Sequence, residues 1–501
     1  MKDFIFGSLA TEQLRLEHER QLLGGVTHKS RRAPRDPAPG QPVDLELIVG
    51  PGVPATQAWL YYTTDGSDPA GAFGQAENGR AIPMQPARTE WNTLDWGYIR
   101  HFRAQVPGQP EGTVVRYRLS AGEDAQLEIF ADQGAYYAFL VADDPVPAWT
   151  RSAVVYHIFI DRFSPEDGKA WAQPDRLDGF FGGTLRGIID RLDYIQELGA
   201  NTLYLSPIFP SDSHHGYNAT DYFSIEPRLG TLEDFRELLD RAHARGMRVL
   251  LDFVPNHWSD QHASFQQAIA DPSSPYRDWY IFSDYPNEYD GFFGVKCMPR
   301  INLRNPAARE HMLAAVRYWL ELGVDGYRLD YAVGPTPDFW ADFRKTVRSA
   351  RPDAWSFGEV VDPPDAQLAF EGLLDGCLDF MLLEGFRQTF AFKTWSAAQF
   401  ASFLARHQAY FPTSFSRPSF LDNHDMDRFI YAADNSRDRL KLAALCQFTL
   451  SGPPMIYYGT EAGLSQKHGI REAGGSFGYL EEARLPMPRI CLPAPKRREP
   501  L

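Results

Sequence analysis

The sequence has little of what disulfide-stabilised, membrane-spanning or nucleic-acid-binding proteins require. Its four cysteines form no closely spaced pair, so we interpret them as free thiols of a reducing compartment. No apolar run approaches the roughly 18 residues of a membrane span, and the N-terminus lacks the basic start and apolar core of a secretory signal. A net charge of −15 leaves no basic surface to neutralise phosphates. We therefore expect a cytoplasmic protein with neither a membrane nor a nucleic acid as partner.

Two cofactor signatures are absent as well. The chain contains neither a Walker phosphate-binding loop nor a G-x-G-x-x-G dinucleotide fingerprint. Aromatic side chains, in contrast, make up 14% of the residues. They fit either large hydrophobic cores or surfaces on which sugar rings stack, and composition does not distinguish the two.

The first part of the chain divides into two regions of different pattern. Residues 1–42 show a weak helical pattern and then the Pro-rich, charged stretch KSRRAPRDPAPGQP at 29–42, which we interpret as a linker. Residues 43–145 contain short alternating runs such as LELIV and VVRYRLSA, separated by turn sequences such as DGSDP. Many short strands with such turns indicate a small all-β sandwich of the immunoglobulin or carbohydrate-binding-module type.

From 146 to 488 apolar runs alternate with amphipathic helical stretches, which indicates an α/β fold with a parallel sheet covered on both faces. Eight such repeats predict a (β/α)8 TIM barrel. The long stretch 257–304 then predicts a small subdomain inserted after the third barrel strand. The eight predicted strands are 154–160, 201–207, 247–254, 324–330, 355–360, 378–383, 418–423 and 453–459.

Polar side chains follow four of these strands, in the stretches DFVPNH, GYRLD, GE and LDNHD. In a barrel of this type the loops after the strands carry the chemistry. Asp330, Glu359 and Asp425 therefore meet at one end of the predicted barrel. Cleavage of a glycosidic bond needs at least two carboxyl groups in opposite protonation states that face one bond. The sequence thus predicts a glycosidase site.

Each of the three acids has an expected role. Arg328 and Asp330 share one face of a strand, and the arginine is expected to lower the pKa of Asp330 and keep it ionised, as a nucleophile requires. Glu359 lies among apolar residues, so burial is expected to raise its pKa and make it the proton donor. Asp425 is expected to keep that donor protonated by repulsion and to bind hydroxyls. Considered alone, the Arg-x-Asp pattern also fits an ion pair that only stabilises the fold, and Glu359 alone also fits a residue that forms a structural salt bridge.

Two histidines near these strand ends, His257 and His424, are expected to bond sugar hydroxyls. They lack the spacing of a metal pair, and the adjacent His214 and His215 diverge on any regular backbone, so we expect no metal site at these residues.

The order of these motifs resembles that of the α-amylase family, glycoside hydrolase family 13, over residues 150–487, with VVYHIFIDRF as its first strand and GPPMIYYGTE as its eighth. The resemblance implies retention of configuration through a covalent glycosyl-enzyme. It assigns Asp330 as nucleophile, Glu359 as acid/base and Asp425 as transition-state stabiliser. By the same resemblance further residues bind the sugar or support the nucleophile: Arg328, His257, His424, Tyr217 and Asp252.

The sandwich before the barrel and MPRIN at 298–302 resemble the neopullulanases, cyclomaltodextrinases and maltogenic amylases. This implies an α-glucan substrate such as starch, maltooligosaccharides, cyclodextrins or pullulan. It also favours a homodimer formed through the N-terminal domain, although sugar binding by that domain, or only packing on the barrel, stays open. YAVG follows Asp330 and VVDPP follows Glu359, in place of the usual residues, so linkage preference and hydrolysis versus transglycosylation or isomerisation also stay open.

The resemblance implies no required cofactor. Asn256 matches a calcium-binding position of many α-amylases, but Thr184 stands where a calcium-binding aspartate is usual, so a structural calcium ion is left open. The resemblance extends to Pro488, after which the chain reads RICLPAPKRREPL. We expect 489–501 to form a Pro-rich tail in place of the last barrel helix and the C-terminal β-domain. A truncated, inactive glucan-binding remnant is therefore the alternative to a working enzyme.

Overall fold

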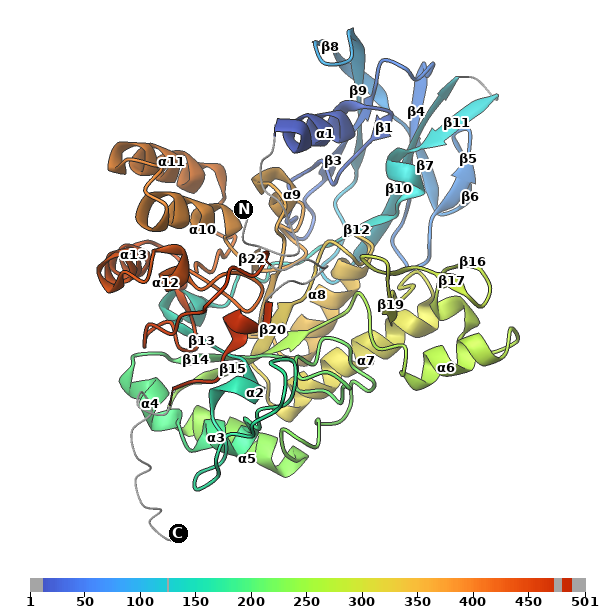
Figure 1. The fold of residues 1–501 in the computed structure, drawn as a ribbon. Helices are drawn as coiled ribbons and strands as arrows, with labels where there is room; N and C mark the ends of the chain where they lie inside the picture. The colour runs from blue at the N-terminus through green and yellow to red at the C-terminus, as the bar shows by residue number, and fades with distance from the viewer. Residues whose placement is uncertain (1–11, 124–125, 473–479, 489–501) are drawn as a thin grey trace.

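The computed structural model describes residues 12–123, 126–472 and 480–488, and the tail expected at 489–501 lies outside them. Helix α1 (Glu12–Leu23) precedes two β-sheets, and a larger α/β region follows them (Figure 1). No helix in the described part of the chain is both long and apolar enough to cross a bilayer.

The two N-terminal sheets each contain five strands. The first has the order β1 (Val26–Thr27), β3 (Val43–Val49), β9 (Gly97–Val106), β8 (Gln85–Asn92), and β2 (Arg32–Ala33) pairs with β3. The second has the order β11 (Leu127–Phe130), β10 (Val114–Glu123), β4 (Gln57–Thr63), β7 (Arg80–Pro83), and β12 (Tyr137–Leu140) pairs with β10. A short hairpin of β5 (Ala70–Ala72) and β6 (Gln75–Asn78) lies between β4 and β7 in the chain.

The apolar residues of these strands form one common core, as their alternation predicts. The stretch 29–42, however, is not only a linker, because it contributes strand β2 to the first sheet. Arg32 within β2 is buried, and it donates hydrogen bonds to the carbonyl oxygens of Arg35 (2.9 Å) and Glu371 (2.7 Å). Those bonds explain why a charged, Pro-rich sequence is fixed in this position.

A seven-stranded parallel sheet forms the centre of the α/β region. Its order is β22 (Gly376–Cys377), β21 (Trp355–Gly358), β20 (Gly326–Leu329), β15 (Arg248–Phe253), β14 (Thr202–Leu205), β13 (Val155–Ile158), β23 (Met455–Tyr457). Isolated parallel bridges join Gly376 to Ser416 and Ser419 to Pro454, and so connect the two edge strands through the segment 416–419. The order of these strands is the order of the predicted barrel strands. The place of the predicted seventh strand is taken by the segment 416–419, which pairs with its neighbours only through these isolated bridges.

The prediction of a sixth strand at 378–383 is wrong. The strand is β22, which ends at Cys377, and helix α10 (Phe380–Phe386) occupies most of the predicted range. Asp379 starts the helix because its carboxylate accepts a hydrogen bond from the backbone N–H of Leu382 (3.0 Å).

Helices surround the sheet (Figure 1). Helix α5 (Leu232–Ala244) begins with a capping box formed by Thr231 and Asp234. Helix α7 (Pro306–Leu322) begins with the cap Asn305 and ends before Gly323, whose φ is 121°. The remaining barrel-side helices are α2 (Ile160–Phe163), α3 (Leu185–Ile189), α4 (Leu192–Glu197), α8 (Phe339–Ala350), α9 (Pro364–Leu368), α11 (Ala397–Tyr410), α12 (Phe429–Ala432) and α13 (Arg437–Thr449).

Residues between β15 and α7 form elements of their own. They are α6 (Ala263–Ala270), the hairpin β16 (Phe282–Asp284) and β17 (Glu288–Tyr289), and the hairpin β18 (Gly291–Phe292) and β19 (Val295–Pro299). An isolated bridge pairs His257, at the start of this segment, with Arg300, near its end. The segment therefore begins and ends beside the carboxyl end of β15.

One carboxylate joins the sandwich to the barrel. Asp338, just before α8, is fully buried, and its Oδ2 accepts hydrogen bonds from three arginines. Arg116 of β10 lies at 2.7 Å, Arg304 at 2.9 Å and Arg309 of α7 at 2.5 Å. In addition Arg304 pairs with Asp68 of the sandwich at 2.6 Å. The two regions therefore meet through a buried, charged junction as well as through the packing of β12 beside α8 (Figure 1).

Candidate active site

The carboxyl ends of β20 and β21 place two acids next to each other. The two strands are neighbours in register, with Leu329 opposite Gly358, so the residues that follow them, Asp330 and Glu359, lie side by side. Each is fixed by a backbone hydrogen bond of 2.9 Å, from Asp330 N–H to the carbonyl of Phe253 and from Glu359 N–H to that of Leu329. Both side chains line a cavity of about 700 Å³.

A single guanidinium contacts three carboxylates below this cavity. Arg328 is fully buried, and its Nη1 donates to Asp330 Oδ1 and to Asp252 Oδ1, both at 2.9 Å. Its Nη2 lies 2.7 Å from Glu359 Oε1. One positive charge is thus shared among three negative groups, so it does not neutralise all of them.

The protonation of Asp330 differs from the sequence-based expectation. Burial raises the pKa of Asp330 well above its ordinary range, Arg328 lowers it only in part, and the charge of Glu359 raises it further. Burial likewise raises the pKa of Glu359, with a further contribution from the charge of Asp425. The expected lowering was wrong because burial outweighs the effect of Arg328, whose charge is also shared with Asp252 and Glu359. The two acids therefore titrate together, and one of them holds a proton to higher pH than an exposed carboxyl does.

Asp425 is in the opposite state. Burial by itself would raise its pKa, but His424 and Arg484 outweigh burial and hold the pKa of Asp425 well below its usual range. His424 Nε2 lies 3.0 Å from Asp425 Oδ2, and Arg484 Nη2 donates to Asp425 Oδ1 at 2.9 Å. The site thus contains an ionised carboxylate close to a pair that retains a proton, which is the contrast that acid–base cleavage of a sugar bond needs.

The remaining predicted residues lie around the same cavity. Tyr217 donates to Asp252 Oδ2 at 2.7 Å, and its ring stacks on that of His424 with the centroids 5.1 Å apart. His257 stacks on Phe292 at 4.2 Å, and burial lowers its pKa to about 3, so the ring is neutral. His257 Nε2 makes no hydrogen bond to any residue that the structure describes. Tyr217, His257 and His424 all line the cavity, and Asp252 and Arg328 lie beneath it.

Sequence reasoning missed several residues of the site. Arg484 is buried in the cavity wall, bonds Asp425 and also donates to the carbonyl of His424 at 2.9 Å. Its partner Glu481 lies 2.7 Å from His214 Nε2. Tyr204 on β14 donates to Asp252 Oδ2 at 2.5 Å. Only the stretch GYLEEARLPMP signalled Arg484, since no strand end or short spacing relates it to the acids.

The two positions that bear on calcium have other contacts. Thr184 caps α3, because its hydroxyl accepts from the N–H of Gly187 at 3.0 Å. The amide nitrogen of Asn256 lies 3.1 Å from His257 Nδ1. Within 12–123, 126–472 and 480–488, no group of three His, Cys, Asp or Glu side chains is arranged to hold a metal ion.

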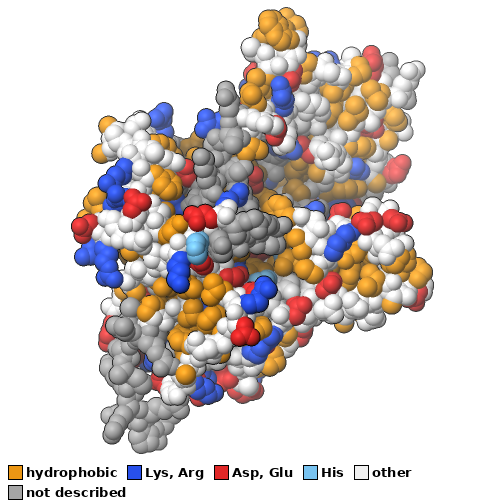
Figure 2. Space-filling view, in the orientation of Figure 1, with side chains coloured by type: hydrophobic (Ala, Val, Ile, Leu, Met, Phe, Trp, Pro, Cys, Tyr) orange, Lys and Arg blue, Asp and Glu red, His pale blue; other side chains and the backbone are white. Residues whose placement is uncertain are grey.

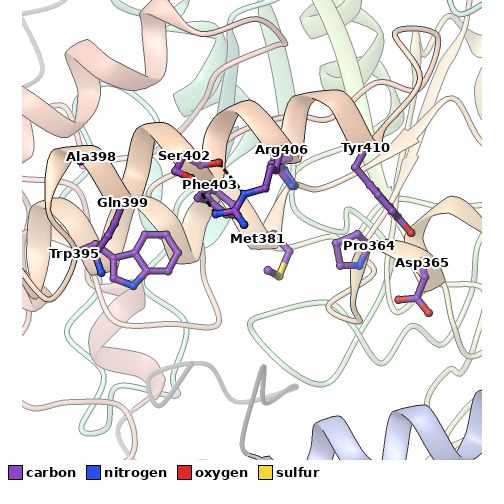
Figure 3. A pocket seen from close by; sticks show the side chains of 11 residues that line it. Pro364, Asp365, Met381, Trp395, Ala398, Gln399, Ser402, Phe403, Arg406 and Tyr410 are labelled. Atoms are coloured by element: carbon purple, nitrogen blue, oxygen red, sulfur yellow. Dashed lines mark hydrogen bonds between the residues drawn. The ribbon is translucent and has the colours of Figure 1, made fainter.

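A second cavity, of about 900 Å³, lies along α11 and α10 (Figure 3). Trp395, Ser402, Arg406 and Tyr410 follow one another along its wall, and Asp365 lies at one end. His407, which also lines it, is bonded to Asp379 at 2.9 Å. This cavity has no pair of facing carboxylates, so we place the chemistry in the cavity at the strand ends.

Comparison with known proteins gives a consistent result. The catalytic-domain model of alpha-amylase matches residues 157–483. "Alpha-amylase 2" of Dictyoglomus thermophilum is 36% identical over 97% of this chain and 82% of its own length. "Neopullulanase 2" of Thermoactinomyces vulgaris is 36% identical, but the match covers 64% of this chain and 58% of that protein. The solved structure of a cyclic α-maltosyl-(1→6)-maltose hydrolase from Arthrobacter globiformis is 34% identical, with a TM-score of 0.62 over 68% of this chain and 82% of that one.

Proposed function

Because the chain belongs to the α-amylase family, whose members act on glycosidic bonds, we propose that it hydrolyses the α-glucosidic bonds of α-glucans with retention of configuration. The observation that carries this proposal is the placement of Asp330 and Glu359, which follow neighbouring strands, line one cavity and contact one guanidinium, so that the buried pair retains a proton at one acid beside the ionised Asp425. Two carboxyl groups of different protonation state beside one bond are the minimum that this reaction requires.

In the proposed mechanism Glu359 donates a proton to the leaving glycosidic oxygen while Asp330 attacks the anomeric carbon. The resulting glycosyl-enzyme ester is hydrolysed by a water molecule that Glu359 deprotonates. Both acids contact one guanidinium. This arrangement is compatible with the separation of about 5–5.5 Å that retaining enzymes use.

The other side chains would hold the sugar ring. Tyr217, stacked on His424, offers an aromatic face to the ring, and the unpartnered Nε2 of His257 is free to bond a hydroxyl. Arg328 and Asp252 would keep Asp330 aligned for attack. Asp425 would stabilise the positive charge that develops at the anomeric centre.

The names of the relatives support an α-glucan as the substrate class, and we extend to this chain only that common feature. We also propose a sandwich at 43–145, a catalytic barrel at 146–488 and a subdomain at about 257–304. Phe292 and Met298 of the subdomain range line the catalytic cavity, so it would complete the binding site. We propose no required cofactor and a cytoplasmic location, as for the "Intracellular maltogenic amylase" of Bacillus subtilis.

A second candidate reaction is transfer of the glycosyl group to another sugar. Tyr331, directly after Asp330, has a φ of 41°, and its ring contacts Phe292 and the exposed Phe293 with centroids 5.1 and 5.3 Å apart. Such an aromatic group beside the nucleophile could hold a sugar acceptor in place of water. Products longer than the starting oligosaccharide would show this reaction.

The test is product analysis on soluble starch, β-cyclodextrin and pullulan, with Asp330→Asn as the blank. Short maltooligosaccharides that are absent from the blank are the expected result, and the preferred substrate identifies the linkage. A soluble, folded protein that releases no sugar from any of the three would overturn the proposal and favour the glucan-binding remnant.

A further inference from the structure

The residue that follows the proposed nucleophile has an unusual backbone conformation. Tyr331 has a φ of 41°, in the left-handed region that bulky residues seldom adopt and that persists only where the surrounding structure enforces it. Tyr331 also lines the catalytic cavity. In Figure 2 acidic and histidine side chains are visible in the middle of the face, in the region where Figure 1 places β20, the strand that leads to Tyr331. The strain therefore lies at the site itself, and strain of this kind concentrates where it serves a function.

The left-handed turn directs a backbone donor at the proposed acid/base. The N–H of Tyr331 donates a hydrogen bond to Oε2 of Glu359 at 3.2 Å. The other carboxyl oxygen, Oε1, lies 2.7 Å from Nη2 of Arg328. A proton on Oε1 would face a positive charge, so Oε2 is the oxygen that can carry the proton to a substrate. The peptide group of Tyr331 thus contacts the oxygen at which the proton transfer takes place.

Neighbouring hydrogen bonds hold this peptide group in its orientation. The carbonyl of Glu359 accepts from the N–H of Ala332 at 3.1 Å, which ties the next residue of the loop to the same acid. The carbonyl of Tyr331 accepts from the N–H of Gly334 at 2.9 Å. Arg300, from the segment between β15 and α7, donates to the carbonyl of Gly334 at 2.9 Å. Because the turn is fixed from both sides, the N–H is oriented before any substrate binds.

We propose that the backbone N–H of Tyr331 positions Glu359 and stabilises the carboxylate that forms there as the proton leaves. Oε2 has two lone-pair sites, of which one accepts from the N–H and the other carries the proton. In the first step Asp330 attacks the anomeric carbon, the bond from that carbon to the glycosidic oxygen breaks, and this oxygen takes the proton from Glu359. The negative charge left on Glu359 strengthens the bond from the N–H. This inference rests on the function proposed above.

Such a contact acts on kcat rather than on substrate binding. The hydrogen bond is weak while Glu359 is protonated and neutral, and it becomes charge-assisted as the proton departs. It is therefore stronger in the transition state than in the bound ground state, which is the condition under which an interaction raises kcat. The ring of Tyr331 has a separate role, because it faces Phe292 and Phe293 and not the carboxyl group.

The same hydrogen bond has a consequence for the pH dependence. Burial raises the pKa of Glu359, and the N–H of Tyr331 is among the groups that lower it. Glu359 acts as an acid only when it is protonated, so activity is lost as the pH rises through its pKa. Removal of the N–H raises that pKa and moves the basic limb of the kcat profile to higher pH. The other charged or titratable groups that face Glu359 stay in place when Tyr331 is changed: Arg328, His424, Asp330 and Asp425.

The experiment separates the backbone of Tyr331 from its side chain. Replacing the residue by p-hydroxyphenyllactate through nonsense suppression turns the amide N–H into an ester oxygen and keeps the phenol ring. The kcat for maltotriose should fall about tenfold, and the basic limb should move up by about half a pH unit or more. Tyr331→Gly keeps the N–H and adopts the left-handed φ without strain. Its basic limb should stay at the parent value, although loss of the ring raises KM.

Phe73 provides the matched control. It too has a left-handed φ, of 49°, and its N–H donates to Oε2 of Glu128 at 2.7 Å. It lies in the turn of the β5–β6 hairpin, at the outer edge of the sandwich and well away from β20 (Figure 1). Phenyllactate at position 73 removes the same kind of hydrogen bond and should leave kcat and both limbs of the pH profile unchanged.

Each failure has its own result. A kcat of the ester protein within twofold of the parent, with an unmoved basic limb, would overturn the inference. An equal movement of the limb in Tyr331→Gly would overturn it too, because the effect would then belong to the ring. If circular dichroism shows the ester protein unfolded, Tyr331→Val replaces it, since a β-branched residue disfavours the left-handed φ and turns the N–H away. Absence of sugar release by the parent would refute the proposed function, whereas an active parent with an equally active ester protein would refute the present inference alone.

Discussion

Arg484 offers the sharpest test of how the site works, because its side chain contacts Asp425 and Glu481 but neither Asp330 nor Glu359. Its Nη2 donates to Asp425 Oδ1 at 2.9 Å, and its Nε fixes the carbonyl of His424. Replacing it by methionine keeps much of the volume and removes the charge. Among the described side chains, Asp425 then keeps His424 as its partner at hydrogen-bond distance.

The size of the effect follows from that contact. A hydrogen bond between charged groups contributes about 1.5–3 kcal/mol, which corresponds to a roughly 10- to 150-fold lower kcat if it acts on the transition state. Arg484 also helps to lower the pKa of Asp425. Its removal raises that pKa, so protonation of Asp425 begins at a higher pH and the acid limb of the kcat profile moves upward. Arg484→Lys keeps the charge and should fall between the two.

The assay is release of reducing sugar from maltotriose between pH 4 and 8, at a temperature where circular dichroism shows each variant folded. Arg317→Met is the control, since Arg317 is an exposed residue of α7 that pairs with Glu310 far from the cavity. A kcat of Arg484→Met within threefold of the parent, with an unmoved acid limb, would refute the reasoning.

Three further predictions follow from the same contacts. Asp330→Asn and Glu359→Gln should each remove nearly all turnover without lowering the melting temperature, because burial already disfavours their charges; substantial turnover in either would argue against the assignment. Asp338→Ala leaves buried guanidinium groups without their carboxylate and should lower the free energy of unfolding, measured by urea titration at pH 7, by about 3–5 kcal/mol. Asp353 is half-exposed, so Asp353→Ala should lower it by less than about 1 kcal/mol. Equal urea midpoints for the two variants would contradict this prediction. Burial would raise the pKa of Asp338, but the arginines outweigh it and lower that pKa in the folded protein. The stability that Asp338 contributes is therefore fully present above the pKa of an unfolded aspartate, about 3.9, and is lost as the pH falls through the lower pKa of the folded state. Finally, dialysis against EDTA should leave activity and melting unchanged, and a loss that calcium reverses would show a required ion.

Much of the site could be predicted because strand ends leave a local signal. Asp330 and Glu359 each directly follow a short apolar run, and parallel strands bring such positions together whatever the intervening loops do. Arg484 had no such signal. It reaches Asp425 only through the path of the chain after β23, which no local pattern encodes.

The errors in the fold and in the electrostatics have physical causes too. The run LDFMLL fits a buried strand or a buried helix equally well, and the cap at Asp379 decides for the helix. The pKa of Asp330 was predicted in the wrong direction because the sequence shows one neighbouring arginine but neither the burial of Asp330 nor the other carboxylates that share that arginine. Buried charges depend on the whole cluster, and a cluster is a property of the fold.

The junction at Asp338 has a consequence for how this protein can be divided. Arg116 of the sandwich and Arg309 of the barrel depend on the same carboxylate oxygen. A barrel expressed without residues 1–145 would lose Arg116 and the partner that Asp68 gives Arg304, and an isolated sandwich would carry Arg116 with no counter-charge. The sandwich is therefore not an independent domain. Dividing the chain at its apparent boundary leaves each fragment with buried charges whose partners are on the other fragment.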